Sequence, residues 1–151
     1  MKKVFYNSKI AKMILMEDYS TITIFAWVFT KYITLKQAVI NHECTHARQW
    51  VELTVLFGLL IWIGMLIFDY SAWYLVFSSV MFYLWYGLEY LVRRFIGLFN
   101  LEEDKQKIAY REVSFEQEAR ISENDDNYLE NSHYFAWMKF LIKNRNNGIL
   151  I

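Results

Sequence analysis

Two apolar stretches separated by only three residues dominate the pattern of hydrophobic and polar positions along this chain. Residues 53–68 are apolar except for Thr54, and residues 72–88 contain no charged side chain. Each stretch approaches the length of about 17 residues that a helix needs to cross a bilayer. The residues between them allow only a tight turn. We therefore expect an antiparallel pair of membrane-spanning helices, with the first span in 35–68 and the second in 72–92.

Basic residues flank this pair of helices on both sides and are absent from the turn that joins them. Those before the pair are Lys31, Lys36 and Arg48, and those after it are Arg93, Arg94, Lys105 and Lys107. Because basic residues stay on the cytoplasmic side of membrane proteins, we expect both chain ends in the cytoplasm and the turn outside. The expected location is a lipid bilayer, the cytoplasmic (inner) membrane of a bacterium.

Upstream of the first span, residues 20–30 are rich in β-branched and aromatic side chains and partly alternate in polarity. This pattern predicts a strand, which we expect to pair with residues 11–16 across a turn at 17–19. Thr34 and Gln37 then fit a capping box, which predicts that a helix begins here. One helix would thus run from this cap into the first span.

That helix carries the sequence His-Glu-Cys-Thr-His at positions 42–46. Residues four apart on an α-helix lie about 40° apart around its axis, so His42 and His46 can bind one metal ion together. Glu43 lies about 100° round from His42 and would reach a water on the metal, not the metal itself. This is the arrangement of a zinc-dependent hydrolase, with histidine ligands and a carboxylate base. From the distance along the helix to Leu53, the metal would lie about 10 Å from the hydrocarbon edge.

Zinc held by two histidines lacks a third protein ligand, and an acidic segment beyond the hairpin can supply one. Ser114 and Gln117 fit a second capping box, which predicts a helix over residues 114–131. Its beginning contains Glu116 and Glu118. Acidic residues in a first turn also complement the helix dipole, so composition alone does not choose a ligand.

In order and spacing these features resemble the integral-membrane gluzincin metalloproteases, which include the CAAX-processing and heat-shock membrane zinc proteases and the transmembrane β-lactam-sensor proteases. The resemblance rests on HExxH at a span, a transmembrane hairpin and a Glu-x-x-Ala helix, and it covers residues 21–120. It implies that Glu116, three residues before Ala119, is the third zinc ligand, with Glu118 as the alternative. It also implies that the strand in 21–30 pairs with the backbone of a peptide substrate.

The chain departs from the family pattern in two places. The spans that usually precede HExxH are missing, so the chain would be a minimal core. Arg120 stands where the family has an aspartate that supports a ligand histidine. Another group must then hold the second nitrogen of each metal-bound imidazole, and Glu89, Glu112 and Glu118 are the candidates. Glu89 has the competing role of pairing with Arg93 at i+4 near the end of the second span.

Other residues have candidate roles outside the motif. Cys44 lies about 200° from His42, so we expect a small buried thiol and not a ligand. Arg48 is expected to meet lipid headgroups. Residues 133–143 mix aromatic and basic side chains and are expected to form an amphipathic helix that lies on the membrane surface or packs over the domain. The open candidates for a donor to the transition state are Tyr110, Tyr128 and His133, although His133 is more simply a surface histidine.

Composition limits the remaining classes of function. The chain of 151 residues has 16 basic and 16 acidic residues, so no net charge attracts nucleic acid, and it contains no nucleic-acid-binding motif. Its single cysteine rules out an intramolecular disulfide. Neither composition nor motif indicates an oligomeric state.

We therefore expect a mainly α-helical integral membrane protein, a two-span helical hairpin with a small cytoplasmic α+β zincin-like metal site. The expected function is a zinc-dependent endopeptidase that binds one Zn²⁺ through His42, His46 and Glu116, with Glu43 as base. Its substrates would be peptides or membrane proteins cleaved at the cytoplasmic membrane face. The alternative is a membrane signalling or assembly protein whose zinc site is structural or inactive. The single domain, 1–151, would comprise the segments 1–34, 35–68, 72–92, 114–131 and 133–143.

Overall fold

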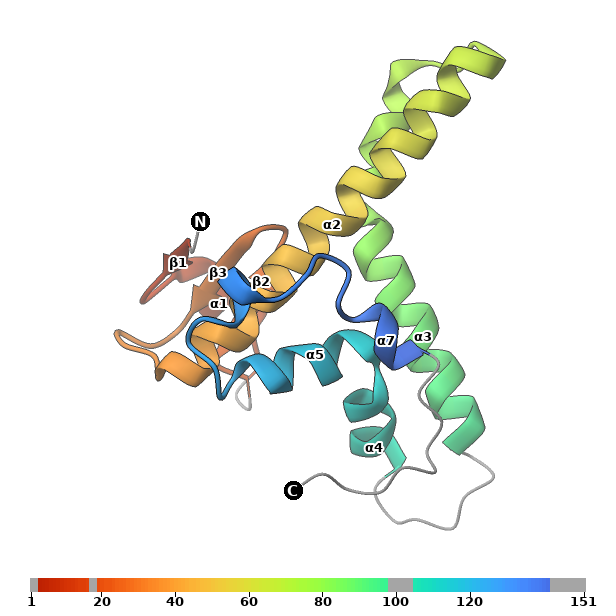
Figure 1. Cartoon of the computed structure of the whole chain (residues 1–151). Coiled ribbons are helices and arrows are strands. Elements are labelled where there is room, and N and C mark those ends of the chain that lie inside the picture. Colours follow the sequence, from red (N-terminus) through yellow and green to blue (C-terminus); the bar gives the residue numbers. More distant parts are fainter. Residues whose placement is uncertain (1–2, 17–18, 98–104, 142–151) are drawn as a thin grey trace.

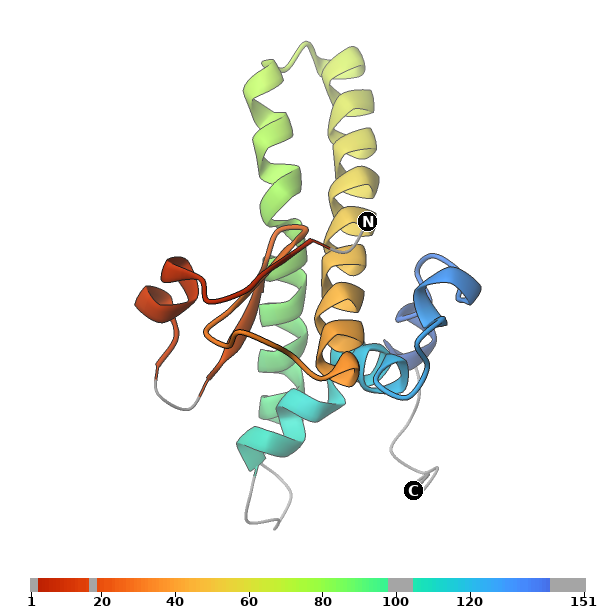
Figure 2. The same cartoon turned by 90° about the vertical axis from the view of Figure 1, so that its left-hand side faces the viewer.

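The computed structural model describes residues 3–16, 19–97 and 105–141 and shows a mostly helical protein with one small sheet. Two long helical segments form a hairpin, and the shorter elements gather around one end of it (Figures 1 and 2). In chain order the elements are β1 (Val4–Phe5), α1 (Lys9–Ile14), β2 (Thr21–Ile24), β3 (Trp27–Thr30), α2 (Gln37–Phe68), η1 (Ala72–Val80), α3 (Met81–Gly97), α4 (Lys105–Glu112), α5 (Ser114–Ser122), α6 (Tyr128–Asn131) and α7 (Met138–Leu141).

Helix α2 is continuous from the segment that carries both histidines to the tip of the hairpin, as the sequence predicts. The predicted cap at Thr34 is wrong, because the helix begins at Gln37 with Lys36 at the N-cap position and no side-chain cap. The Gln37 amide instead donates to Asn41 Oδ1 one turn ahead (2.8 Å), so it does not turn back to close a capping box. The helix ends at Asp69, whose φ of 54° starts the expected tight turn.

The second half of the hairpin is helical over the predicted range but begins with a tighter winding. η1 is a 3₁₀ helix, and α3 continues from it as an α-helix. Within η1, the hydroxyls of Ser78 and Ser79 donate to the carbonyls three residues earlier, each at 2.7 Å. Gly58 of α2 faces this segment, since a Cβ added there would lie 3.7 Å from Ser78 Oγ. The two halves of the hairpin therefore approach each other closely at this level.

The described residues contain two helical segments that are long and apolar enough to cross a membrane, Gln37–Phe68 and Ala72–Gly97. Only 11% of the most apolar part of each is buried within the protein, so most of these side chains face outward. The hairpin extends well beyond the other elements (Figure 2). A helix in the core of a soluble protein is instead covered by the rest of its chain. The apolar surface of the hairpin therefore lacks such cover from the described part of the protein.

The N-terminal region differs from the single strand predicted for residues 20–30. β2 and β3 form an antiparallel hairpin in which Thr21 lies opposite Thr30. Phe25, in the turn between them, has a φ of 57°, and its N–H donates to Tyr83 Oη on α3 (2.6 Å). This contact anchors the turn on the second long helix, and the predicted strand is divided in two.

The predicted partner of that strand, residues 11–16, is also wrong. These residues lie mostly in α1, whose N-cap Ser8 accepts a hydrogen bond from the helix backbone. The strand that pairs with β3 on its other side is β1, in parallel, with Val4 opposite Val28. The predicted turn at 17–19 falls largely outside the described residues. In the order β1-β3-β2, β2 is an edge of the described sheet.

The C-terminal part is more divided than the sequence predicts. The helix predicted over 114–131 is shorter, because α5 ends at Ser122 and α6 is a separate turn. An amphipathic helix over 133–143 does not form within the described residues, where only α7 is helical. Trp137 and Phe140 from this segment are buried, so it packs over the domain, one of the two arrangements expected for it.

A small aromatic core joins α5 and the C-terminal segment to the hairpin. Its buried members are Leu53, Phe82, Val113, Phe115 and Trp137. The Phe115 ring lies 4.6 Å from the Trp137 ring and 5.0 Å from the Phe82 ring, measured between ring centroids. Because Glu116 follows Phe115 directly, burial of the Phe115 ring fixes where Glu116 lies against α2.

Candidate metal centre

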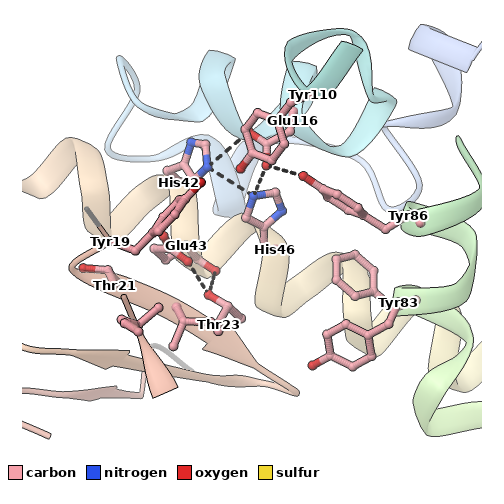
Figure 3. Close-up of a pocket in the computed structure, with 14 residues that line it drawn as sticks. Tyr19, Thr21, Thr23, His42, Glu43, His46, Tyr83, Tyr86, Tyr110 and Glu116 are labelled. Atoms are coloured by element: carbon pink, nitrogen blue, oxygen red, sulfur yellow. Dashed lines mark hydrogen bonds and ion pairs between the residues drawn. The ribbon is translucent and has the colours of Figure 1, made fainter. Parts of the chain in front are cut away.

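Three side chains predicted as ligands meet at one end of a pocket (Figure 3). His42 and His46 lie one turn apart on α2, and Glu116 comes from the first turn of α5. One ligand atom from each lies within 4.8 Å of the others. The two histidine Nε2 atoms are 3.1 Å apart, and Glu116 Oε1 lies 3.1 Å from His46 Nε2. Among the described residues, no further His, Cys, Asp or Glu belongs to this group.

The second ring nitrogen of each histidine has its own oxygen partner. His42 Nδ1 lies 2.8 Å from Glu123 Oε1, and His46 Nδ1 lies 2.8 Å from Gln49 Oε1. An ionised carboxylate can only accept, so His42 Nδ1 is the donor to Glu123. Histidines that bind metals are oriented in this way by partners at the distal nitrogen.

The side chain of Gln49 sets the same tautomer on His46. Gln49 Nε2 donates to Phe115 O (3.1 Å) and to Glu118 Oε2 (2.9 Å), both of which are acceptors. The amide oxygen must therefore be the atom that faces His46 Nδ1, and this nitrogen carries the proton. In the neutral imidazoles of both histidines, a lone pair is left on Nε2 and points into the ligand group.

The ligand group consequently contains more acceptors than donors. Tyr86 Oη donates to Glu116 Oε1 (2.9 Å), but Glu116 Oε2 is buried without a hydrogen-bond partner and lies 3.6 Å from His42 Nε2. Acceptors packed this closely require a cation, either a proton on an imidazole or a metal ion. Two imidazoles and one carboxylate fit Zn²⁺, and other divalent first-row metals bind the same donor set.

The carboxyl group of Glu116 is ionised over the neutral pH range, as a metal ligand must be. Burial by itself would raise its pKa. The hydrogen bond and the positive charge offered by His46 outweigh burial and lower the pKa of Glu116 to about 2. Tyr110 interacts with this carboxylate, and burial together with the Glu116 charge raises the pKa of the Tyr110 hydroxyl. Tyr110 therefore remains a neutral donor.

Glu43 lines the same pocket but does not join the ligand group. Its Oε2 atom accepts a hydrogen bond from Thr23 Oγ1 on β2 (2.6 Å), as Figure 3 shows. This bond connects the helix that carries the histidines with the edge strand of the sheet. The Glu43 carboxylate is thereby held beside the ligand group and faces a molecule that enters the pocket.

The pocket has a volume of about 370 Å³ and lies between β2 and α3. Its walls are largely aliphatic and aromatic, with the ligand group at one end (Figure 3). Besides the ligand group and Glu43, the lining residues are Leu15, Tyr19, Thr21, Ile22, Thr23, Phe82, Tyr83, Tyr86, Gly87 and Tyr110.

Glu118, the alternative ligand, is fully buried outside the ligand group. It accepts hydrogen bonds from Arg48 Nη2 (2.7 Å) and Tyr128 Oη (3.1 Å), in addition to the Gln49 amide. Arg48 was expected to meet lipid headgroups, and this is wrong. Its guanidinium lies inside the protein against Glu118 and Glu52, because these two buried carboxylates need a cation. Glu118 therefore supports His46 indirectly, through Gln49, and is not itself part of the ligand group.

Glu89, another candidate for orienting the histidines, has different partners. Glu89 forms the expected pair with Arg93 (3.2 Å), and it also accepts hydrogen bonds from the Ser114 N–H (2.9 Å) and hydroxyl (2.6 Å). The predicted capping box at Ser114 is wrong for this reason, since the Ser114 hydroxyl is directed to Glu89 and Val113 is the N-cap. Glu89 holds the start of α5 in place. Glu112 does not line the pocket.

The three side chains considered as transition-state donors lie in different places. Tyr110 lines the pocket. Tyr128 is buried against Glu118, away from the pocket, and His133 is exposed. Cys44 is buried, as expected, and is not part of the ligand group.

Gln49 and Glu123, which contact the two histidines at Nδ1, were not predicted from the sequence. Gln49 lies three residues after His46, and Glu123 lies seven residues after Glu116, about two turns along the same helix face. Helical spacing could therefore have identified both. Thr23 left no such signal, because its contact with Glu43 depends on how β2 packs against α2.

Comparison of the chain with models of protein families, with curated proteins and with solved structures found no match.

Proposed function

We propose that this protein is a zinc-dependent endopeptidase embedded in a membrane. One observation carries the proposal: His42, His46 and Glu116 form a three-residue ligand group at the end of a pocket that Glu43 also lines. A catalytic zinc site has three protein ligands, an open position and a nearby base, and these residues match that pattern. The layout also resembles the membrane gluzincin proteases, in which peptide-bond hydrolysis uses the same types of residue in the same order.

The residues of the ligand group would hold the zinc through His42 Nε2, His46 Nε2 and the Glu116 carboxylate. When bound, zinc supplies a Lewis acid that polarises the scissile carbonyl and acidifies a water molecule. Glu43 takes the proton from that water as it attacks the carbonyl carbon, and then gives the proton to the leaving amine nitrogen. The hydrogen bond from Thr23 keeps the Glu43 carboxylate oriented for both transfers.

Strand β2 is the proposed site for the substrate backbone. It is an edge of the described sheet, and three of its residues line the pocket. An extended peptide can add to such an edge through main-chain hydrogen bonds. A peptide in this position would pass beside Glu43, because Thr23 of β2 already contacts that side chain.

The two long apolar segments support a position in a membrane, which we propose to be the inner membrane of a bacterium. Lys31 and Lys36 before the hairpin and Arg94 after it favour both chain ends in the cytoplasm. Arg48 no longer contributes to this argument, because it is paired inside the protein. The pocket would then open at the cytoplasmic face, and peptides or membrane proteins near that surface would be the substrates.

The alternative, a signalling or assembly protein with a structural zinc site, requires a closed set of four ligands. The described residues supply three ligands, and the same three residues line the pocket. This observation favours the enzyme over the alternative.

Replacement of the proposed base tests the function directly. Glu43→Gln protein, purified with added zinc, is expected to keep one zinc per chain and to lose cleavage of an internally quenched peptide library by at least about 100-fold. Glu130→Gln, at an exposed position on α6, is the matched control and should behave as wild type. Unchanged cleavage in Glu43→Gln would show that Glu43 is not the base. Wild-type protein that binds no added zinc would contradict the proposed metal site.

A further inference from the structure

The wall of the pocket on α3 contains a glycine that the proposed chemistry does not use. Gly87 lines the pocket from within the α-helix. Neither crowding nor backbone geometry requires a glycine here, because no described glycine has a positive φ and a Cβ added at Gly87 meets no atom within 4 Å. Glycine is common in membrane-spanning helices, and Gly64 has the same open space. What distinguishes Gly87 is its position in the pocket wall.

The surroundings of this gap are apolar. Phe82, Tyr83 and Tyr86 come from the same wall, and Ile22 of β2 also lines the pocket. The lining contains no lysine or arginine, and its two carboxylates belong to Glu43 and Glu116. A charged substrate side chain would find no dedicated partner on the α3 wall, whereas an aromatic or branched aliphatic one would be covered on several sides.

We propose that Gly87 is a specificity-determining residue whose missing side chain leaves a subsite for a bulky apolar residue of the substrate. This rests on the proposed peptidase function and deepens it by naming the substrate class. Side chains of an extended peptide alternate in direction, so a peptide paired with β2 presents every second side chain to the opposite wall. The preferred substrates are peptides with a large apolar residue near the scissile bond.

Filling the gap tests the subsite without touching the ligand group. Gly87→Leu places an apolar side chain in the open space, and Gly87→Ala places a smaller one there. Gly64→Leu is the matched control, because a Cβ at Gly64 also meets no atom within 4 Å and Gly64 does not line the pocket. Zinc content is measured for each protein, so that loss of the metal is recognised separately.

Two readouts separate binding from chemistry. The first is cleavage of paired peptides that differ only in carrying phenylalanine or alanine at one varied position. The second is fluorescence anisotropy of the labelled peptides with each variant in a Glu43→Gln background, where cleavage is off. Gly87→Leu is expected to weaken binding and cleavage of the phenylalanine peptide about 10- to 100-fold and to leave the alanine peptide within about threefold. Gly87→Ala should fall between wild type and Gly87→Leu.

The outcomes distinguish the subsite from the function. If wild type cleaves peptides and Gly87→Leu keeps the wild-type preference for phenylalanine, the proposed subsite is contradicted. The proposed peptidase function is then still supported. If Gly87→Leu retains zinc but binds and cleaves both peptides equally less well, the subsite is also contradicted, since the substitution would not discriminate between the two side chains. If zinc-loaded wild type neither cleaves nor binds either peptide, the proposed function itself fails, and the subsite with it.

Discussion

Glu123 determines which nitrogen of His42 is offered to a metal. Its carboxylate holds the proton on Nδ1, and the lone pair on Nε2 then faces His46 and Glu116. In the membrane gluzincin proteases that the sequence resembles, an aspartate directly after the Glu-x-x-Ala motif has the supporting role, and Arg120 occupies that position here. The support comes instead from Glu123, which follows the last residue of α5 and lies three positions after Arg120.

Substitution of Glu123 should therefore weaken the metal site without unfolding the protein. Glu123→Ala removes the acceptor at His42 Nδ1, and we expect zinc affinity to fall about 10- to 100-fold. The measurement is competition for zinc against a chelator of known affinity. Glu130→Ala removes an exposed glutamate from α6 and should leave zinc affinity unchanged. Equal zinc affinity in Glu123→Ala and wild type would show that Glu123 does not orient His42.

At the same scale, the sequence predicts best what local helix geometry decides. The positions of His42, Glu43 and His46 on one helix follow from their spacing alone. The contact between His46 and Gln49 is equally local and could have been predicted. Thr23 could not be, because its bond to Glu43 depends on the packing of a strand against a helix distant in the sequence.

Among the elements, α5 carries two buried glutamates with different tasks. Glu116 faces the histidines, and Glu118 faces Arg48 and Gln49 on the side of α2. Glu116→Gln is expected to weaken zinc binding at least about 100-fold, because it removes the charged ligand. Glu118→Gln is expected to retain zinc within about tenfold but to lower the midpoint of thermal unfolding, since Arg48 loses a buried ionic partner.

Zinc titration and a thermal-unfolding scan, made on the same preparations, distinguish the Glu116→Gln and Glu118→Gln proteins. If Glu118→Gln loses zinc and Glu116→Gln keeps it, the assignment of the third ligand is reversed. Loss of zinc in both variants, each still folded, would make Glu118 essential for holding His46.

Capping residues show why the boundaries of elements were harder to predict than their existence. The long helix, the hairpin and the helix with Glu116 were all expected. Both capping boxes were wrong, because Gln37 and Ser114 form hydrogen bonds with other helical residues, Asn41 and Glu89. A capping box takes account only of hydrogen bonds between residues close in the sequence. Once α3 packs against α5, the Glu89 carboxylate accepts a hydrogen bond from the Ser114 hydroxyl that the capping box would have used.

For the molecule as a whole, the hairpin sets where the site lies. The apolar surface of the hairpin is mostly uncovered by the rest of the described protein. The sheet and α5 lie toward the end away from the turn (Figures 1 and 2), and residues of β2 and α5 line the pocket. A hairpin that crosses a membrane therefore places the turn on one side and the pocket at the other.

Cysteine labelling in intact bacterial cells tests this arrangement. Ser71→Cys in the turn should react with a membrane-impermeant maleimide from outside, whereas Tyr134→Cys, 74% exposed in the C-terminal segment, should react only after lysis. Wild type is the control for background, because its only cysteine, Cys44, is buried. Labelling of both variants, or of neither, in intact cells would contradict the proposed orientation.

The proposed centre is a metal ion held by two imidazoles and one carboxylate, with a further position open to the pocket. X-ray absorption at the zinc K-edge of the purified protein measures this directly. We predict a first shell of nitrogen and oxygen only, at about 2.0–2.1 Å, with the multiple-scattering signature of two imidazoles and no sulfur near 2.3 Å. One imidazole should disappear from this signature in His46→Ala. A zinc–sulfur shell, four imidazoles, or a spectrum that is unchanged in His46→Ala would contradict the proposed centre.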